Sequence, residues 1–347
     1  MVKLVDELRA LGELSDENLR FLIESEDENL LAELMRQADE ARREVYGKNV
    51  YLRGLIEITS YCKNNCYYCG IRRGNSAAER YRLTPDAILQ CCENGYKLGF
   101  RTFVLQGGED AWFTDEVLCP LISEVKSRFP DCAVTLSLGE RSEESYCALR
   151  NAGADRYLLR HEAASEELYR QLHPTEMSLE NRRNCLYTLK KLGFQIGAGF
   201  MVGAPFQSTW HLIDDLRFLK ELCPQMVGIG PFVPHRDTQF SSQNSGKLSL
   251  TLRLLAIVRL MLPYALIPAT TALGTIHPLG RSLGLKAGCN VVMPNLSPVG
   301  VRAKYSLYDG KISSGSEAAE GCKMLAEEII SAGFQPDFSR GDAHPLA

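Results

Sequence analysis

Short apolar runs alternate with longer amphipathic segments along most of the chain. The amphipathic segments are typical of helices, and the short runs, rich in Val, Ile, Leu and Thr, are typical of buried strands. Eight runs are expected to be strands: LIEIT (55–59), TFVLQ (102–106), AVTLSL (133–138), RYLLR (156–160), QIGAGFMV (195–202), MVGIGP (226–231), ALIPAT (265–270) and NVVMP (290–294). Strands that alternate with helices predict an α/β fold with a parallel sheet, and eight such units predict a full (β/α)8 TIM-like barrel.

Helix boundaries support this division. The segment TPDAILQCCENGYKLG has Thr84 as N-cap and Pro85 at the first helical position, and SLENRRNCLYTLKKLG runs from the cap Ser178 to Gly193. Residues 3–48 repeat apolar positions at a period of 3.6, which predicts helices before the first strand.

We expect a single domain, because no long low-complexity linker separates the βα units. Its predicted parts are a helical extension (1–50), the barrel (51–295) and a C-terminal closing tail (296–347).

Polar residues follow the ends of several predicted strands. Three cysteines follow the first strand, Gly107–Asp110 follow the second, Arg160–Glu162 end the fourth and Thr270–Thr271 end the seventh. The loops after barrel strands gather on one face, so we expect these residues to form one site there.

The charge balance favours a small substrate. The 347 residues carry a formal net charge of -4 and a pI near 6.0, which leaves no basic surface for nucleic acid. The first residues mix acids with Leu and Val, unlike a signal peptide, and no uncharged apolar run reaches the roughly 18–20 residues of a membrane helix. We therefore expect a soluble, cytoplasmic protein without a nucleic-acid or membrane partner.

Three of the twelve cysteines form a distinct motif. Cys62, Cys66 and Cys69 have the spacing C-x3-C-x2-C directly after a predicted strand, whereas the other nine are scattered. Iron–sulfur clusters are usually held by four thiolates, so a set of three leaves one iron open and reactive. Zinc is the alternative, but it needs a fourth ligand from elsewhere.

With Tyr68 directly before the last cysteine, the motif resembles that of the radical S-adenosylmethionine (SAM) superfamily. The resemblance implies a 4Fe-4S cluster on the three cysteines, SAM bound at the open iron, and reductive cleavage of SAM to a 5′-deoxyadenosyl radical. An exposed iron also implies oxygen sensitivity.

The same resemblance implies a set of SAM-binding residues. Gly107 and Gly108 let a ligand approach the backbone closely, and Glu162 and Arg182 offer an acceptor and a forked donor to a zwitterion and its hydroxyls. An ordinary turn and a surface ion pair are the respective alternatives. The implied cofactor-binding set is Tyr68, Gly107, Gly108, Glu109, Ser137, Glu162, Arg182 and Met201.

Longer strings resemble the HydE family, the radical SAM maturases of FeFe-hydrogenase. They include RYRLTPDAI, VLQGGEDAW, GADRYLLRHEAA, GAGFMVGAP and LIPATTALGTI, and the resemblance runs over nearly the whole chain. It implies assembly of the diiron active site of hydrogenase on an iron–cysteine complex bearing CO and cyanide. The implied partners are this organometallic substrate, the other hydrogenase maturases and an electron donor.

The substrate cavity is expected to be cationic and polar. Arg156 and Arg160 are four residues apart on one predicted strand, so both are expected to point into the barrel, where they would attract anionic groups. An internal salt bridge is the alternative. Further residues match positions that line the family's cavity, with plain packing as the alternative: Thr135, Met226, Thr270, Thr271, Tyr305 and Tyr308.

No auxiliary cluster is expected. Some HydE relatives carry a second cluster on a C-x7-C-x2-C set near the tail, but here KISSGSEAAEGCKM has Ser313 at the first matching position and only Cys322 nearby.

Three other functions stay open. Biotin synthase shares the motif but needs cysteines on barrel strands, and five of the predicted strands that we compared contain none. Methylornithine synthase is closer in plan, although the paired Arg and the ATTALGT string fit HydE better. A non-catalytic iron–sulfur carrier would suit three thiolates but has no use for a complete barrel.

Overall fold

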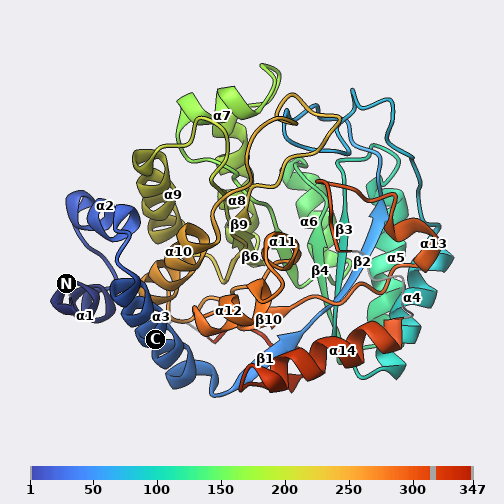
Figure 1. Ribbon diagram of the computed structural model, residues 1–347. Helices are drawn as coiled ribbons and strands as arrows, with labels where there is room; N and C mark the ends of the chain where they lie inside the picture. The colour runs from blue at the N-terminus through green and yellow to red at the C-terminus, as the bar shows by residue number, and fades with distance from the viewer. Residues whose placement is uncertain (1, 313–317, 345–347) are drawn as a thin grey trace.

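The computed structural model describes residues 2–312 and 318–344, and its centre is a wall of six parallel strands (Figure 1). In spatial order these strands are β2 (Gly54–Thr59), β3 (Thr102–Gly107), β4 (Ala133–Ser137), β5 (Arg156–Leu158), β6 (Gln195–Ala198) and β8 (Met226–Val227). The helices that connect them lie outside the wall: α4 (Pro85–Lys97), α5 (Asp115–Arg128), α6 (Glu143–Asn151), α7 (Glu166–Leu172), α8 (Leu179–Lys191) and α9 (Thr209–Leu222). The expected α/β, TIM-like architecture is confirmed.

The sheet does not close into a full barrel, because single bridges replace a continuous ladder in the remaining arc. Three parallel bridges link the remaining segments: Met226 to Leu266, Pro268 to Val291, and Leu55 to Asn295. The predicted seventh strand, 265–270, is therefore not a regular strand. Pro268 has no backbone N–H to donate, which prevents a normal ladder at this position. Three helices and a short strand occupy this arc: α10 (Leu248–Met261), α11 (Thr271–Ile276), α12 (Gly280–Lys286) and β10 (Val291–Val292).

Two predicted strands are split at glycines. The run 195–202 gives β6 and then β7 (Met201–Val202), and the run 226–231 gives β8 and then β9 (Gly230–Pro231). A Cβ added to Gly199 would lie only 2.0 Å from the carbonyl oxygen of Gly228. The two backbones thus approach more closely than larger residues permit, and β7 and β9 continue as a separate parallel pair.

The predicted helices before the barrel are present as α1 (Val2–Leu11), α2 (Asp16–Glu24) and α3 (Glu28–Tyr46). Ser15 and Asp27 cap α2 and α3 with their side-chain oxygens. Leu30 and Leu34 of α3 are buried, and α3 packs against α10 (Figure 1). No helix in the described part of the chain is long and apolar enough to cross a membrane.

A second sheet, absent from the sequence-based prediction, joins the two ends of the described chain. Strand β1 (Asn49–Leu52) pairs in parallel with β10 on one side and with β11 (Gln335–Asp337) on the other. The tail also contains α13 (Val299–Arg302) and α14 (Ala318–Ser331). The predicted closing tail therefore contacts both ends of the barrel, since Tyr308 and Lys311 line its mouth and β11 lies at the opposite end.

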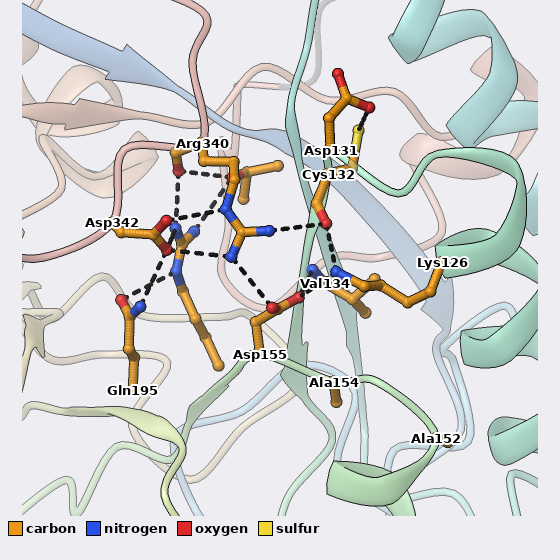
Figure 2. Close-up of polar contacts among 12 residues, drawn as sticks. Lys126, Asp131, Cys132, Val134, Ala152, Ala154, Asp155, Gln195, Arg340 and Asp342 are labelled. Atoms are coloured by element: carbon orange, nitrogen blue, oxygen red, sulfur yellow. Dashed lines mark hydrogen bonds and ion pairs between the residues drawn. The ribbon is translucent and has the colours of Figure 1, made fainter.

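Residues 338–344, here called the strap, close the end of the barrel where the strands begin. Figure 2 shows Arg340 between Asp342 and Asp155, with Gln195 beside Asp342. Asp342 accepts from Arg156 Nη2 at 2.6 Å and from Gln195 Nε2 at 3.0 Å. Burial works to raise the pKa of Asp342, but hydrogen bonds from Arg340 and Arg156 outweigh it and hold that pKa well below its usual range.

Replacing Asp342 by Ala is expected to lower the free energy of unfolding by about 3 kcal/mol, because Arg156 stays buried without its carboxylate. This value is at the low end of the range that is usual for breaking a buried ion pair, since the Asp342 side chain is 40% exposed and water replaces part of the interaction. Because the pKa of Asp342 is depressed, its stabilisation is present at neutral pH and is lost as the pH falls through the folded-state value.

Urea unfolding at several pH values checks this expectation. The difference between wild type and Asp342→Ala should be constant above about pH 5 and should shrink below about pH 4. Glu44→Ala, which removes an exposed partner of Arg9, is the control and should change stability by about 1 kcal/mol or less. A similar small effect for Asp342→Ala would show that the strap contributes little to stability.

Candidate active site

Residues 60–75, here called the cysteine loop, leave β2 without regular secondary structure. Arg80, which follows the loop in the sequence, holds the loop backbone in place, because its guanidinium donates to the backbone carbonyls of Ile71 and Arg72, each at 2.7 Å. Asn75 donates from its side chain to the Gly70 carbonyl at 2.7 Å. Side chains thus supply the hydrogen bonds that a helix or strand would otherwise provide.

Cys62, Cys66 and Cys69 line one cavity of about 350 Å³ at the carboxyl ends of the strands. Burial raises the pKa of each thiol, to about 12 for Cys69, and the neighbouring thiols raise that of Cys66 further. Without a bound cation the three thiols are therefore protonated, and a metal centre must displace their protons.

The donor set fits an iron–sulfur cluster better than a single metal ion. Within residues 2–312 and 318–344, no three His, Cys, Asp or Glu side chains converge tightly enough to hold one ion. A 4Fe-4S cluster asks for a wider arrangement, because each thiolate binds a different iron. Three thiols on one loop that line one cavity are the donor set that such a cluster would use, with one iron left for another ligand.

Gly108 is needed where the loop after β3 meets the cysteine loop, and Gly107, the last residue of β3, packs against Thr59 of β2. A Cβ on Gly108 would lie 2.2 Å from the carbonyl oxygen of Tyr61. Lys63 N donates to the Glu109 carbonyl at 2.8 Å in the same contact. Both glycines also line the cavity, so their small size serves the packing of the two loops as well as access to the backbone.

Two ion-pair groups place charges of both signs at the cavity wall. Arg182 lies 2.8 Å from Glu140 (Nε to Oε1) and 3.6 Å from Glu109 (Nη2 to Oε1). Burial works against the Arg182 charge, but the two carboxylates outweigh it and raise its pKa well above the ordinary value. Arg160 Nη2 lies 2.9 Å from Glu162 Oε2, and Glu162 has a φ of 66°, which is strained for a residue other than glycine. Such a wall suits a zwitterionic ligand.

The structure brings most of the predicted site residues together. All eleven residues expected to hold the cluster or SAM line this one cavity. Of the eight expected to contact substrate, four line it: Arg160, Thr270, Thr271 and Tyr308. The other four lie outside the cavity wall: Thr135, Arg156, Met226 and Tyr305.

The prediction that Arg156 and Arg160 share one cavity is wrong. Arg156 is the first residue of β5 and is bound to Asp342 of the strap, whereas Arg160 follows the end of this strand. Four residues at about 3.3 Å per residue separate them by about 13 Å along the barrel. Alternation predicts the side of a sheet that a residue faces but not its depth. For Arg156 the alternative, an internal salt bridge, is present.

Thr135, Met226 and Tyr305 are buried side chains that do not line the cavity. Thr135 is 2% exposed, and its hydroxyl has no hydrogen-bond partner among the described residues. Met226 Sδ accepts from Arg53 Nη1 at 3.2 Å, deep in the barrel. The Tyr305 hydroxyl accepts from Gln106 Nε2 at 3.4 Å, and Gln106 lines the cavity, so Tyr305 stands directly behind its wall.

Sequence reasoning missed a buried ion pair in the cavity wall. Glu57 on β2 pairs with Lys311 from the tail, and their side chains are 1% and 11% exposed. Asn295 Nδ2 donates to the second Glu57 oxygen at 2.9 Å. The Glu within the apolar run LIEIT is a usable signal, because a buried carboxylate needs a partner. Lys311 carries no comparable local signal.

Comparison with known proteins assigns the family. Residues 56–219 match the Radical SAM superfamily. The [FeFe] hydrogenase maturase subunit HydE of Thermotoga maritima is 47% identical over 300 residues, which cover 86% of this chain and 85% of that protein. The chain belongs to the HydE family of radical SAM enzymes. A second relative of this HydE-family chain, the 3-methylornithine synthase of Methanosarcina acetivorans, is 31% identical and covers 93% of this chain and 91% of its own length.

Solved structures agree with the fold of the HydE-family chain. The crystal structure of methylornithine synthase (PylB) has a TM-score of 0.83 and 27% identity, covering 96% of this chain and 97% of that one. The FeFe-hydrogenase maturase HydG from Carboxydothermus hydrogenoformans has a TM-score of 0.80 at 22% identity, covering 97% and 79%. At that identity the HydG likeness is evidence for the fold alone.

Proposed function

We propose that this chain acts in the assembly of the diiron active site of FeFe-hydrogenase, on an iron–cysteine complex that bears CO and cyanide. The observation that carries the proposal is that the three thiols open on the same cavity as Arg182, Glu162 and the Gly107–Gly108 backbone. The 47% identity to a HydE protein, against 31% to a methylornithine synthase, favours maturation over amino-acid chemistry.

Cys62, Cys66 and Cys69 would hold a 4Fe-4S cluster in this proposal. When bound, the cluster and SAM together supply a 5′-deoxyadenosyl radical by one-electron cleavage of SAM. The residues of this chain bind and orient the ligands and exclude water. Arg182 supplies a forked donor and Glu162 an acceptor for the amino-acid and hydroxyl groups of SAM. The remaining members of the proposed SAM site line the same cavity: Tyr68, Glu109, Ser137 and Met201.

The substrate would meet the polar residues on the remaining wall. Arg160, Thr271 and Tyr308 line this wall, together with Thr270, whose Oγ1 is buried without a hydrogen-bond partner among the described residues. A buried hydroxyl without a partner costs stability, so its presence supports a polar ligand group at this position. The nitrogen of an iron-bound cyanide accepts such a hydrogen bond.

The variant Thr270→Val is expected to leave the free protein as stable as wild type, or slightly more stable, and to weaken substrate use. Loss of one hydrogen bond should raise the KM for the iron complex by about tenfold at most. Thr270→Ser keeps the hydroxyl and should retain most of the affinity. A rise in KM with Thr270→Ser alone, the variant that lacks the methyl group, would assign the contact to that methyl group, and an unchanged KM in Thr270→Val would contradict the hydrogen bond.

The proposal also includes partner proteins. A complex carrying CO and cyanide needs a separate maturase as its source, because neither ligand is a product of SAM cleavage. Each cleavage consumes one electron, so an electron donor must reduce the cluster before every turnover.

Two experiments test the proposed function. The protein, reconstituted without oxygen with iron and sulfide and reduced by dithionite, should give an EPR signal that changes on addition of SAM, and it should release 5′-deoxyadenosine. No change and no release would favour the carrier alternative. In a maturation mixture with the partner maturases and apo-hydrogenase, hydrogenase activity should depend on this chain. Formation of 3-methylornithine from an amino-acid mixture, without maturation, would favour the methylornithine synthase alternative.

A further inference from the structure

Residues 172–177, here called the brace, begin with the last residue of α7 and contact the cysteine loop at several points, although the two segments are about a hundred residues apart in the sequence. The contacts are a backbone hydrogen bond from Tyr67 N to Leu172 O (3.0 Å), the pair Tyr68 OH and His173 Nε2 (3.1 Å), Arg73 Nη2 to Glu176 Oε1 (3.4 Å), and Cys66 Sγ to Met177 Sδ (3.7 Å). The brace therefore supports the stretch of the cysteine loop that carries two of the three thiols.

His173 makes the best-defined of these contacts. Its ring is 1% exposed, stacks on Tyr169 at 4.0 Å between ring centroids, and meets the Tyr68 ring edge-on at 5.4 Å. His173 Nδ1 lies 2.9 Å from the Tyr169 carbonyl oxygen. A carbonyl only accepts, so the proton must be on Nδ1, and the other ring nitrogen, Nε2, is left to accept from the Tyr68 hydroxyl.

The buried setting keeps this arrangement constant. Burial lowers the pKa of His173 to about 3, so the ring is neutral and Nε2 is free to accept at any physiological pH. Tyr68 lies between Cys66 and Cys69 in the sequence and lines the same cavity as their thiols. A hydroxyl fixed by a rigid acceptor holds the Tyr68 ring, and with it the adjoining backbone, in one position.

We propose that His173 is a positioning residue for SAM binding, which acts by clamping Tyr68 and so fixing the cavity wall between Cys66 and Cys69. This inference rests on the proposed function, because SAM is the ligand that it names. A residue that only fills the core would stabilise the protein without a specific effect on SAM affinity, so the two roles predict different measurements.

The test uses Tyr68→Phe, which removes only the hydroxyl, His173→Phe, which keeps a stacking ring but removes the acceptor, and the double variant. Each reconstituted holoenzyme is titrated with SAM under anaerobic conditions, and iron per chain is measured on the same samples. Each single variant should raise the Kd for SAM by about two- to tenfold, the loss of one hydrogen bond, with iron content unchanged. The Kd of the double variant should be no higher than that of the single variant with the higher Kd, because both substitutions remove the same hydrogen bond.

Tyr187→Phe is the matched control, since it removes an exposed tyrosine hydroxyl that bonds to Glu221 on the surface, and its Kd should equal that of wild type. Unchanged Kd values in Tyr68→Phe and His173→Phe would overturn the inference. The inference would also be overturned if the increases in Kd of the two single variants multiplied in the double variant, or if a loss of iron accounted for the weaker binding of SAM. If His173→Phe does not fold, Tyr68→Phe decides alone. Failure of the wild-type holoenzyme to bind SAM would instead remove the proposed function, and the inference with it.

Discussion

Replacing Cys66 by Ala is expected to reduce release of 5′-deoxyadenosine to the level seen without enzyme. A cluster held by three thiolates retains only two protein ligands in this variant, so iron per chain should fall well below that of wild type. The measurements are iron and sulfide content after reconstitution, and chromatography of the nucleoside after reduction with dithionite in the presence of SAM.

Cys119→Ala is the matched control for this experiment. Cys119 is a partly exposed free thiol that does not line the cavity, so its removal should leave iron content and nucleoside release at the wild-type level. If Cys66→Ala retained both, another side chain would have to be the third ligand of the cluster.

Replacing Lys311 by Met is expected to lower the free energy of unfolding by about 3–5 kcal/mol, because Glu57 is left as a buried, unpaired carboxylate. Asn295 still donates to one Glu57 oxygen, but a neutral amide does not balance the charge. The tail should loosen as well, since Lys311 also donates to the Tyr305 carbonyl at 2.9 Å. Urea unfolding gives the stability, and amide hydrogen exchange over residues 305–311 reports the tail.

Two further variants separate charge from packing. The double variant Glu57→Gln with Lys311→Met removes both charges and should recover a large part of the lost stability. Lys191→Met breaks an exposed pair with Glu143 and should change stability by about 1 kcal/mol or less. A loss in Lys311→Met as small as that in Lys191→Met would show that water reaches Glu57 in the folded protein.

The regular part of the barrel is predictable because its signals are local. Each of the strands β2 to β6 coincides with or falls inside an apolar run to within one residue, and cap residues such as Thr84 and Ser178 mark the helices between them. Strand β1 has no comparable signal. It consists of four residues next to a long helix, and it is a strand because it pairs with β11, far along the chain.

The candidate site likewise has one part that local sequence signals predict and another part that they do not. The cysteine loop and Gly107–Glu109 were found from residue types at strand ends, where barrel geometry gathers the loops. The substrate residues were harder to predict, because depth inside a barrel depends on where a strand begins. Arg156 and Arg160 illustrate this, since one is bound by the strap and the other lines the cavity. The contact of His173 with Tyr68 has no sequence motif at all.

The pairing of β1 with β11 also constrains how the chain is made. Asn49 binds Asp337 through its side chain, and 288 residues separate the two. During synthesis β1 therefore emerges long before the strand that covers its edge and before the strap that neutralises Arg156. Uncovered strand edges readily pair with other chains, and slow, long-range pairing prolongs their exposure. The nascent chain should thus be most prone to aggregation in the interval before β11 has been made, and chaperone supply during that interval should govern the yield of folded protein.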